Sequence, residues 1–134
     1  MKTIDYAKAA GIAALVLIVD VLIAIGVVYL YAAFINPGHP RDYYAVVGIS
    51  VARWSTRVAG TALLLGVAWI CGRRNPNRNA YAFAAAITFF YALLDAASTL
   101  FQGVFTASFA FTIALKLAGA VFGAWAATRT RALA

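Results

Sequence analysis

The chain of 134 residues has few charged side chains, one cysteine and one histidine. Charged residues make up 11% of it, against about a quarter in ordinary soluble proteins. The single Cys71 excludes an internal disulfide and any redox or metal motif built from several cysteines. His39 lies between two prolines, so the apolar segments hold no histidine that could ligate a haem. Ser-His and phosphate-binding glycine motifs are also lacking, and we expect neither enzymatic activity nor a cofactor.

Hydrophobic residues dominate what is present, at 65% of the chain. This composition predicts a membrane protein whose main partner is the lipid bilayer. The net charge of +7 would also suit a nucleic-acid-binding protein, but the basic residues occur in short clusters between apolar runs. Because no basic helix or aromatic-basic motif is present, we expect no nucleic-acid partner.

Four segments are long enough to cross a hydrocarbon core, which needs about 20 residues. They cover approximately residues 9–35, 43–71, 80–101 and 104–128, and we treat 1–134 as one integral membrane domain. The first run is too long for a signal peptide, so we expect it to be retained. Arg53 and Arg57 divide the second run, which leaves two alternatives: residues 43–52 form an interfacial helix, or the whole run is one long tilted helix.

The distribution of basic residues predicts the orientation of these spans. Arg53 and Arg57 lie inside a span and are not counted. Of the other basic residues near the ends of the spans, only Arg41 lies on one side of the membrane. The opposite side holds Lys2, Lys8, Arg73, Arg74, Arg78, Arg129 and Arg131. We therefore predict an all-α, four-helix transmembrane bundle with up-down-up-down topology in a bacterial-type inner membrane. Both termini are expected to be cytoplasmic, with a tight turn near Gln102 and Gly103 on the far side.

The third span carries a polar stripe, although the segment is otherwise apolar. Its members follow one another at helical spacing and therefore share a face: Thr88, Tyr91, Asp95, Ser98 or Thr99, and Gln102. A carboxylate in hydrocarbon costs several kcal/mol, so Asp95 needs a cation, a proton or water beside it. We expect this face to point into the bundle.

Helical rise gives each buried charge a depth, at about 1.5 Å per residue. Asp20 and Lys116 come out at about 16 Å and 18 Å from the cytoplasmic ends of their helices, and Asp95 and Arg57 at about 24 Å and 22 Å. We therefore predict two ion pairs, Asp20 with Lys116 and Asp95 with Arg57. Arg53 lies one turn further out than Arg57, where it can extend to the headgroups.

The fourth span places Lys116 on the same face as Gly119 and Gly123. These glycines form a GxxxG pair, which lets another helix backbone approach closely. The pattern predicts packing within the molecule and indicates that Lys116 points into a helix contact.

Two interpretations of these charges remain open. In the first, they line a polar pocket that binds or transports a small anionic or polar-headed ligand, with proton coupling through Asp95; the site residues would be Arg53, Arg57, Asp95, Lys116, Asp20, Tyr91 and Thr88. Transport through so narrow a bundle would suggest a homodimer. In the second, the pairs only fix helix register in an accessory or assembly subunit of a larger membrane complex.

Overall fold

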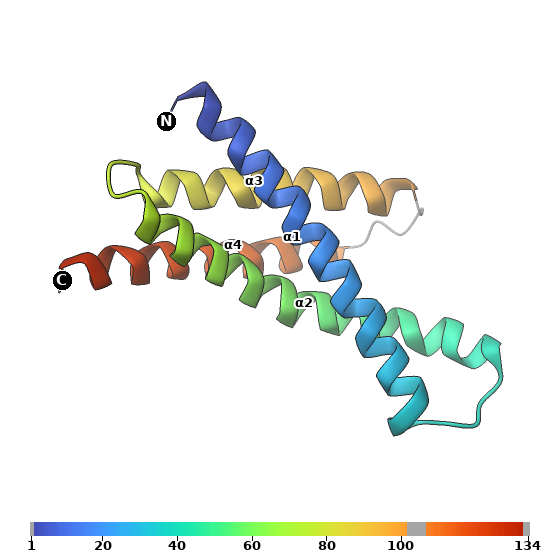
Figure 1. Ribbon diagram of the computed structural model, residues 1–134. Helices are drawn as coiled ribbons and strands as arrows, with labels where there is room; N and C mark the ends of the chain where they lie inside the picture. The colour runs from blue at the N-terminus through green and yellow to red at the C-terminus, as the bar shows by residue number, and fades with distance from the viewer. Residues whose placement is uncertain (1, 102–106, 133–134) are drawn as a thin grey trace.

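The computed structural model describes residues 2–101 and 107–132, and these residues form an all-helical structure (Figure 1). The elements are α1 (Thr3–Leu30), a π-helical turn η1 (Tyr31–Ile35), α2 (Arg41–Arg74), α3 (Ala80–Phe101) and α4 (Ala107–Ala132). Four helices are long and apolar enough to cross a membrane, so the predicted all-helical fold with four candidate membrane spans is confirmed. The turn predicted near Gln102 and Gly103 lies outside the described residues.

Oxygen atoms cap the starts of two helices. The Asp5 carboxylate accepts a hydrogen bond of 2.9 Å from the Lys2 backbone N–H at the start of α1. Asn79 Oδ1 accepts from the backbone N–H groups of Tyr81 and Ala82, both at 3.1 Å, at the start of α3. Such caps satisfy N–H groups that the helix leaves free and contribute about 1 kcal/mol each. They explain why α3 can begin directly after a short turn.

Tyrosine side chains organise the connection between α1 and α2. The Tyr44 hydroxyl donates to the Asn36 carbonyl oxygen at 2.6 Å, and the His39 ring stacks on Tyr43 at 4.2 Å between centroids. Gly38 takes a φ of 91°, which favours glycine. From Arg41 onward α2 is one uninterrupted helix, so residues 43–52 belong to the same long helix as the rest of the segment.

The four helices pack in a ring in which α1 and α4 each contact both α2 and α3. In Figure 1, α1 crosses the other helices obliquely. The most extensive contact joins α2 and α4, whereas α2 and α3 touch only slightly. Buried residues of the core come mainly from the inward faces and include Leu64, Phe83 and Ile87.

Small residues make the close contact between α2 and α4 possible. A Cβ on Gly119 would lie 2.7 Å from Thr61 Cγ2, and a Cβ on Gly123 would overlap the Leu65 carbonyl oxygen. A third close approach joins Gly72 to the Ala127 side chain. The GxxxG pair therefore packs within the molecule, as predicted, and it turns Lys116 toward the interior.

Candidate functional site

Three helices meet at a cluster of charged and polar side chains in the middle of the bundle. Lys116 Nζ on α4 lies 3.2 Å from Asp20 Oδ2 on α1. The Tyr91 hydroxyl on α3 donates to the same carboxylate oxygen at 2.7 Å and accepts from Lys116 Nζ at 2.6 Å. All three residues are 1% exposed. We call Asp20, Tyr91 and Lys116 the central cluster.

The remaining helix, α2, contributes a glycine that makes room for the central cluster. A Cβ on Gly60 of α2 would lie 2.5 Å from Lys116 Cε and 2.6 Å from Asp20 Oδ2. The sequence analysis missed this residue. A signal was present, because glycine in a helix interior costs about 1 kcal/mol relative to alanine and therefore needs a packing or functional reason.

The predicted pairing of Asp20 with Lys116 is confirmed. An unpaired charge buried this far from water would be costly, and the opposite charge together with the Tyr91 hydroxyl offsets most of that cost. One oxygen of the Asp20 carboxylate, however, has no partner in the described part of the chain to replace the water that it loses on burial. Among the buried side-chain atoms that the structure describes, only Asp20 Oδ1 lacks a hydrogen-bond partner.

The predicted pairing of Asp95 with Arg57 is wrong. Arg57 Nε donates instead to Thr112 Oγ1 at 3.2 Å, and its Nη2 donates to the Ser108 hydroxyl. Within residues 2–101 and 107–132, the ion pairs are Asp5 with Arg78 and Asp20 with Lys116. The physical reason is the direction of the side chains: Arg57 lies on the face of α2 that packs on α4, where it reaches Thr112 and Ser108.

Asp95 is half-buried one turn beyond Tyr91 on α3. Its electrostatic neighbours are Lys116 and Asp20, so two carboxylates act on the same ammonium group. Two further members of the polar stripe on α3 bond within their own helix and not to the central cluster. Ser98 Oγ and Thr99 Oγ1 donate to the Asp95 backbone carbonyl at 2.8 Å and 3.1 Å, within their own helix.

The two other predicted site residues do not join the central cluster. The buried Thr88 Oγ1 donates to the Ala84 carbonyl oxygen at 3.0 Å, which satisfies it within α3. Arg53 is exposed, in keeping with a side chain that extends toward the headgroups.

The charged side chains inside the bundle form two sites of different charge balance. The central cluster and Asp95 combine one cation with two carboxylates, whereas Arg57 is a cation surrounded by hydroxyl groups and by the aromatic faces of Trp54 and Phe111, 5.0 Å and 5.8 Å away. No protein family, curated protein or solved structure matches the chain.

Proposed function

We propose that this protein is a non-enzymatic membrane protein that binds a small anionic or polar-headed ligand at Arg57 and couples its passage across the bilayer to protons. The observation that carries the proposal is the guanidinium of Arg57, which lies within a helix apolar enough to cross a membrane and bonds to hydroxyl groups rather than to a carboxylate. Hydroxyl oxygens accept from two of its N–H donors but leave its charge without a counter-ion.

An anion would supply the missing charge. The guanidinium fork is suited to oxyanions that offer two oxygens side by side, such as carboxylates, sulfonates and phosphates. The Ser108 hydroxyl beside it could then donate to the same ligand, because a hydroxyl both donates and accepts, whereas the Thr112 hydroxyl already donates to the Ser108 carbonyl oxygen at 2.9 Å. The aromatic faces of Trp54 and Phe111 favour a ligand with an apolar part.

Proton coupling follows from the charge balance of the central cluster. Lys116 neutralises one carboxylate, and Asp20 and Asp95 together supply two. A proton on one of them removes the excess negative charge. We place this proton on Asp95, because Asp95 is half-buried whereas Asp20 is buried. Binding of an anion at Arg57 and of a proton at Asp95 would together bring both sites to neutrality.

The orientation belongs to the proposal as well. We place four spans up-down-up-down in a bacterial-type inner membrane with both termini cytoplasmic. Three observations support this: the ion pair of Asp5 with Arg78 joins the start of α1 to the α2–α3 turn, Gly72 contacts Ala127 near the end of α4, and basic residues concentrate at this same end. A homodimer would widen the path.

A second candidate is an accessory subunit of a larger membrane complex. It is favoured by the burial of the central cluster, whose residues are 1% exposed and bond to one another. Buried charges that pair with each other can have a purely structural role, in which they fix the relative position of the helices. In that case Arg57 would bind no ligand.

Two arginines one turn apart on α2 provide the test. We would measure thermal unfolding of the purified protein in detergent with phosphate, sulfate or benzenesulfonate, at constant ionic strength. At least one anion should stabilise the wild type and Arg53→Gln, whereas Arg57→Gln should lose the response, because Arg53 is exposed and Arg57 is the cation of the site.

Equal stabilisation of Arg57→Gln, or no response of the wild type to any of the three anions, would reject the ligand site and favour the accessory role. Arg57→Lys keeps the charge but not the fork, so it should respond with weaker affinity. This variant separates loss of the site from loss of folding.

A further inference from the structure

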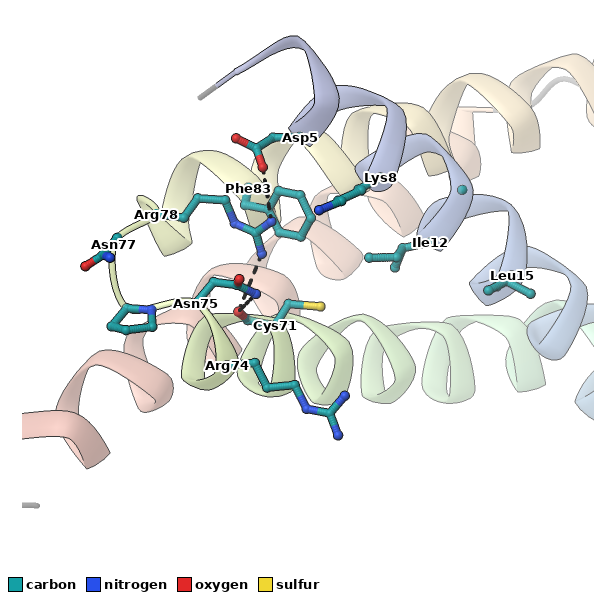
Figure 2. Close-up of a pocket in the computed structure, with 12 residues that line it drawn as sticks. Asp5, Lys8, Ile12, Leu15, Cys71, Arg74, Asn75, Asn77, Arg78 and Phe83 are labelled. Carbon is teal, nitrogen blue, oxygen red and sulfur yellow. Dashed lines mark hydrogen bonds and ion pairs between the residues drawn. The ribbon is translucent and has the colours of Figure 1, made fainter.

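A cavity of about 670 Å³ opens at the end of the bundle where α1 starts and α2 ends (Figure 2). Its basic lining residues are Lys8, Arg74 and Arg78, and its single acidic lining residue is Asp5. Ile12, Leu15 and Phe83 line its apolar part. The cavity lies apart from the central cluster and from Arg57, and the sequence analysis assigned no site to its residues.

The acidic neighbour is already used within the protein. Asp5 Oδ1 lies 3.5 Å from an Arg78 guanidinium nitrogen. The Arg78 guanidinium also lies over the Phe83 ring, with its central carbon 3.2 Å from the ring centroid, and it donates to the Cys71 carbonyl oxygen at 3.5 Å. Figure 2 shows Arg78 directed toward Asp5 and Phe83. These contacts fix one cation in the wall of the cavity.

The other two cations are exposed and uncompensated. Within the part of the chain that the structure describes, neither Lys8 nor Arg74 takes part in an ion pair. Lys8 points toward Arg78 across the cavity, and Arg74 lies at its rim on the side of α2 away from Lys8 (Figure 2). The cavity therefore keeps two positive charges for a ligand.

An apolar groove continues from this cavity between α1 and α2. Its volume is about 300 Å³, and it shares Ile12, Leu15 and Cys71 with the cavity. The remaining lining residues are all aliphatic: Val16, Val19, Leu63, Val67 and Ile70. From Lys8 to Val19 the helix rises about 16 Å, which is close to half of the roughly 30 Å hydrocarbon core.

We propose that the cavity and the groove together hold one anionic phospholipid from the adjacent leaflet. Its phosphate would lie between Lys8 and Arg78 with Arg74 at the edge, and one acyl chain would follow the groove as far as Val19. Charge complementarity selects the lipid class, because basic pockets at membrane surfaces attract anionic headgroups whereas a zwitterionic headgroup brings its own cation. The length of the groove selects a lipid over a soluble anion, since a free phosphate would leave the aliphatic lining unused.

The test compares neighbouring arginines on α2. Native mass spectrometry of the full chain would measure binding of phosphatidylglycerol against phosphatidylcholine with identical acyl chains. The wild type should prefer phosphatidylglycerol, and Lys8→Gln and Arg74→Gln should each weaken its binding about fivefold, as expected for one surface cation. Arg73→Gln is the matched control, because Arg73 lies over Trp69 outside the cavity and its loss should leave binding within twofold.

A second arm tests the acyl chain. Val19→Trp fills the far end of the groove at a side chain that is already exposed, so it should weaken phosphatidylglycerol binding without unfolding the protein. Soluble glycerol 3-phosphate should fail to compete at the lipid concentration. The proposal is overturned if glycerol 3-phosphate competes equally, if Val19→Trp binds like the wild type, or if Arg73→Gln weakens binding as much as Arg74→Gln does. None of these outcomes depends on ligand binding at Arg57.

Discussion

At the scale of single residues, the buried charges are held by geometry that leaves little freedom. Lys116 has an ion pair with Asp20 and a hydrogen bond to Tyr91, and Gly60 lies against both charged side chains. A hydrogen-bonded ion pair of this kind is costly to break at one end, because the remaining charge stays in hydrocarbon. The central cluster should therefore respond differently to single and double changes.

We expect Lys116→Met to lower the free energy of unfolding by about 3 kcal/mol, since it leaves Asp20 without its counter-ion. The double variant Asp20→Asn with Lys116→Met should recover much of that loss, because no charge then remains at the centre. Reversible unfolding in mixed detergent and sodium dodecyl sulfate micelles would measure both. Purely additive losses would show that the pair is not coupled.

Gly60→Ala should destabilise the protein by about 1–3 kcal/mol, the usual cost of overpacking a filled interior. The added methyl group must displace Lys116 Cε or Asp20 Oδ2, which are held by their own contacts. Gly66→Ala on the same helix is the control, because a Cβ there meets nothing within 4 Å. It should be neutral or slightly stabilising, and equal loss in both variants would contradict the packing role of Gly60.

The residue scale also shows where sequence reasoning succeeds and fails. Helical rise gave the depths of Asp20 and Lys116, and depth was sufficient because their helices both turn these residues inward. Arg57 and Asp95 have similar depths too, yet they do not pair. Depth does not say toward which helix each side chain points, and that direction depends on how the helices pack through many small side chains.

At the scale of helices, the apolar runs and their flanking prolines, asparagines and charges were enough to locate the spans. The predicted bounds of α3 agree with the structure, and α2 extends a few residues further at both ends than its apolar run. The single helix through Arg53 and Arg57 could not be predicted from hydropathy, because interfacial and tilted helices share the same pattern. With 34 residues, α2 is about 51 Å long.

The seam between α2 and α4 should be the most sensitive helix contact. Gly123→Ala would push a methyl group into the Leu65 carbonyl oxygen, and backbone cannot move aside as a side chain can. We expect a loss of about 2 kcal/mol or more in the same unfolding assay. Ala118→Val on the exposed face of α4 is the control and should change stability by less than about 0.5 kcal/mol.

At the scale of the whole molecule, the proposed function links two sites on different helices. Arg57 offers an uncompensated cation between α2 and α4, and Asp95 on α3 offers a carboxylate near Lys116. Passage of a monovalent anion with one proton is electrically neutral, so it does not work against the membrane potential.

Proteoliposomes loaded with the pH indicator pyranine test this coupling. An inward gradient of phosphate, sulfate or benzenesulfonate should acidify the lumen with the wild type, at least for the anion that stabilises it in detergent. Asp95→Asn should abolish the acidification while keeping anion-dependent thermal stabilisation, because Arg57 is intact. Acidification that persists in Asp95→Asn would exclude this carboxylate as the proton carrier.

The contact between Asp20 and Lys116 has a consequence for biosynthesis. The two residues are 96 positions apart, so at about 5–20 residues per second the ribosome needs roughly 5–20 s to deliver the second after the first. During that interval the nascent first helix carries a carboxylate without its ammonium partner. A chain stalled before α4 would therefore keep the Asp20 carboxyl group in its first helix without the ammonium group that pairs with it in the finished protein.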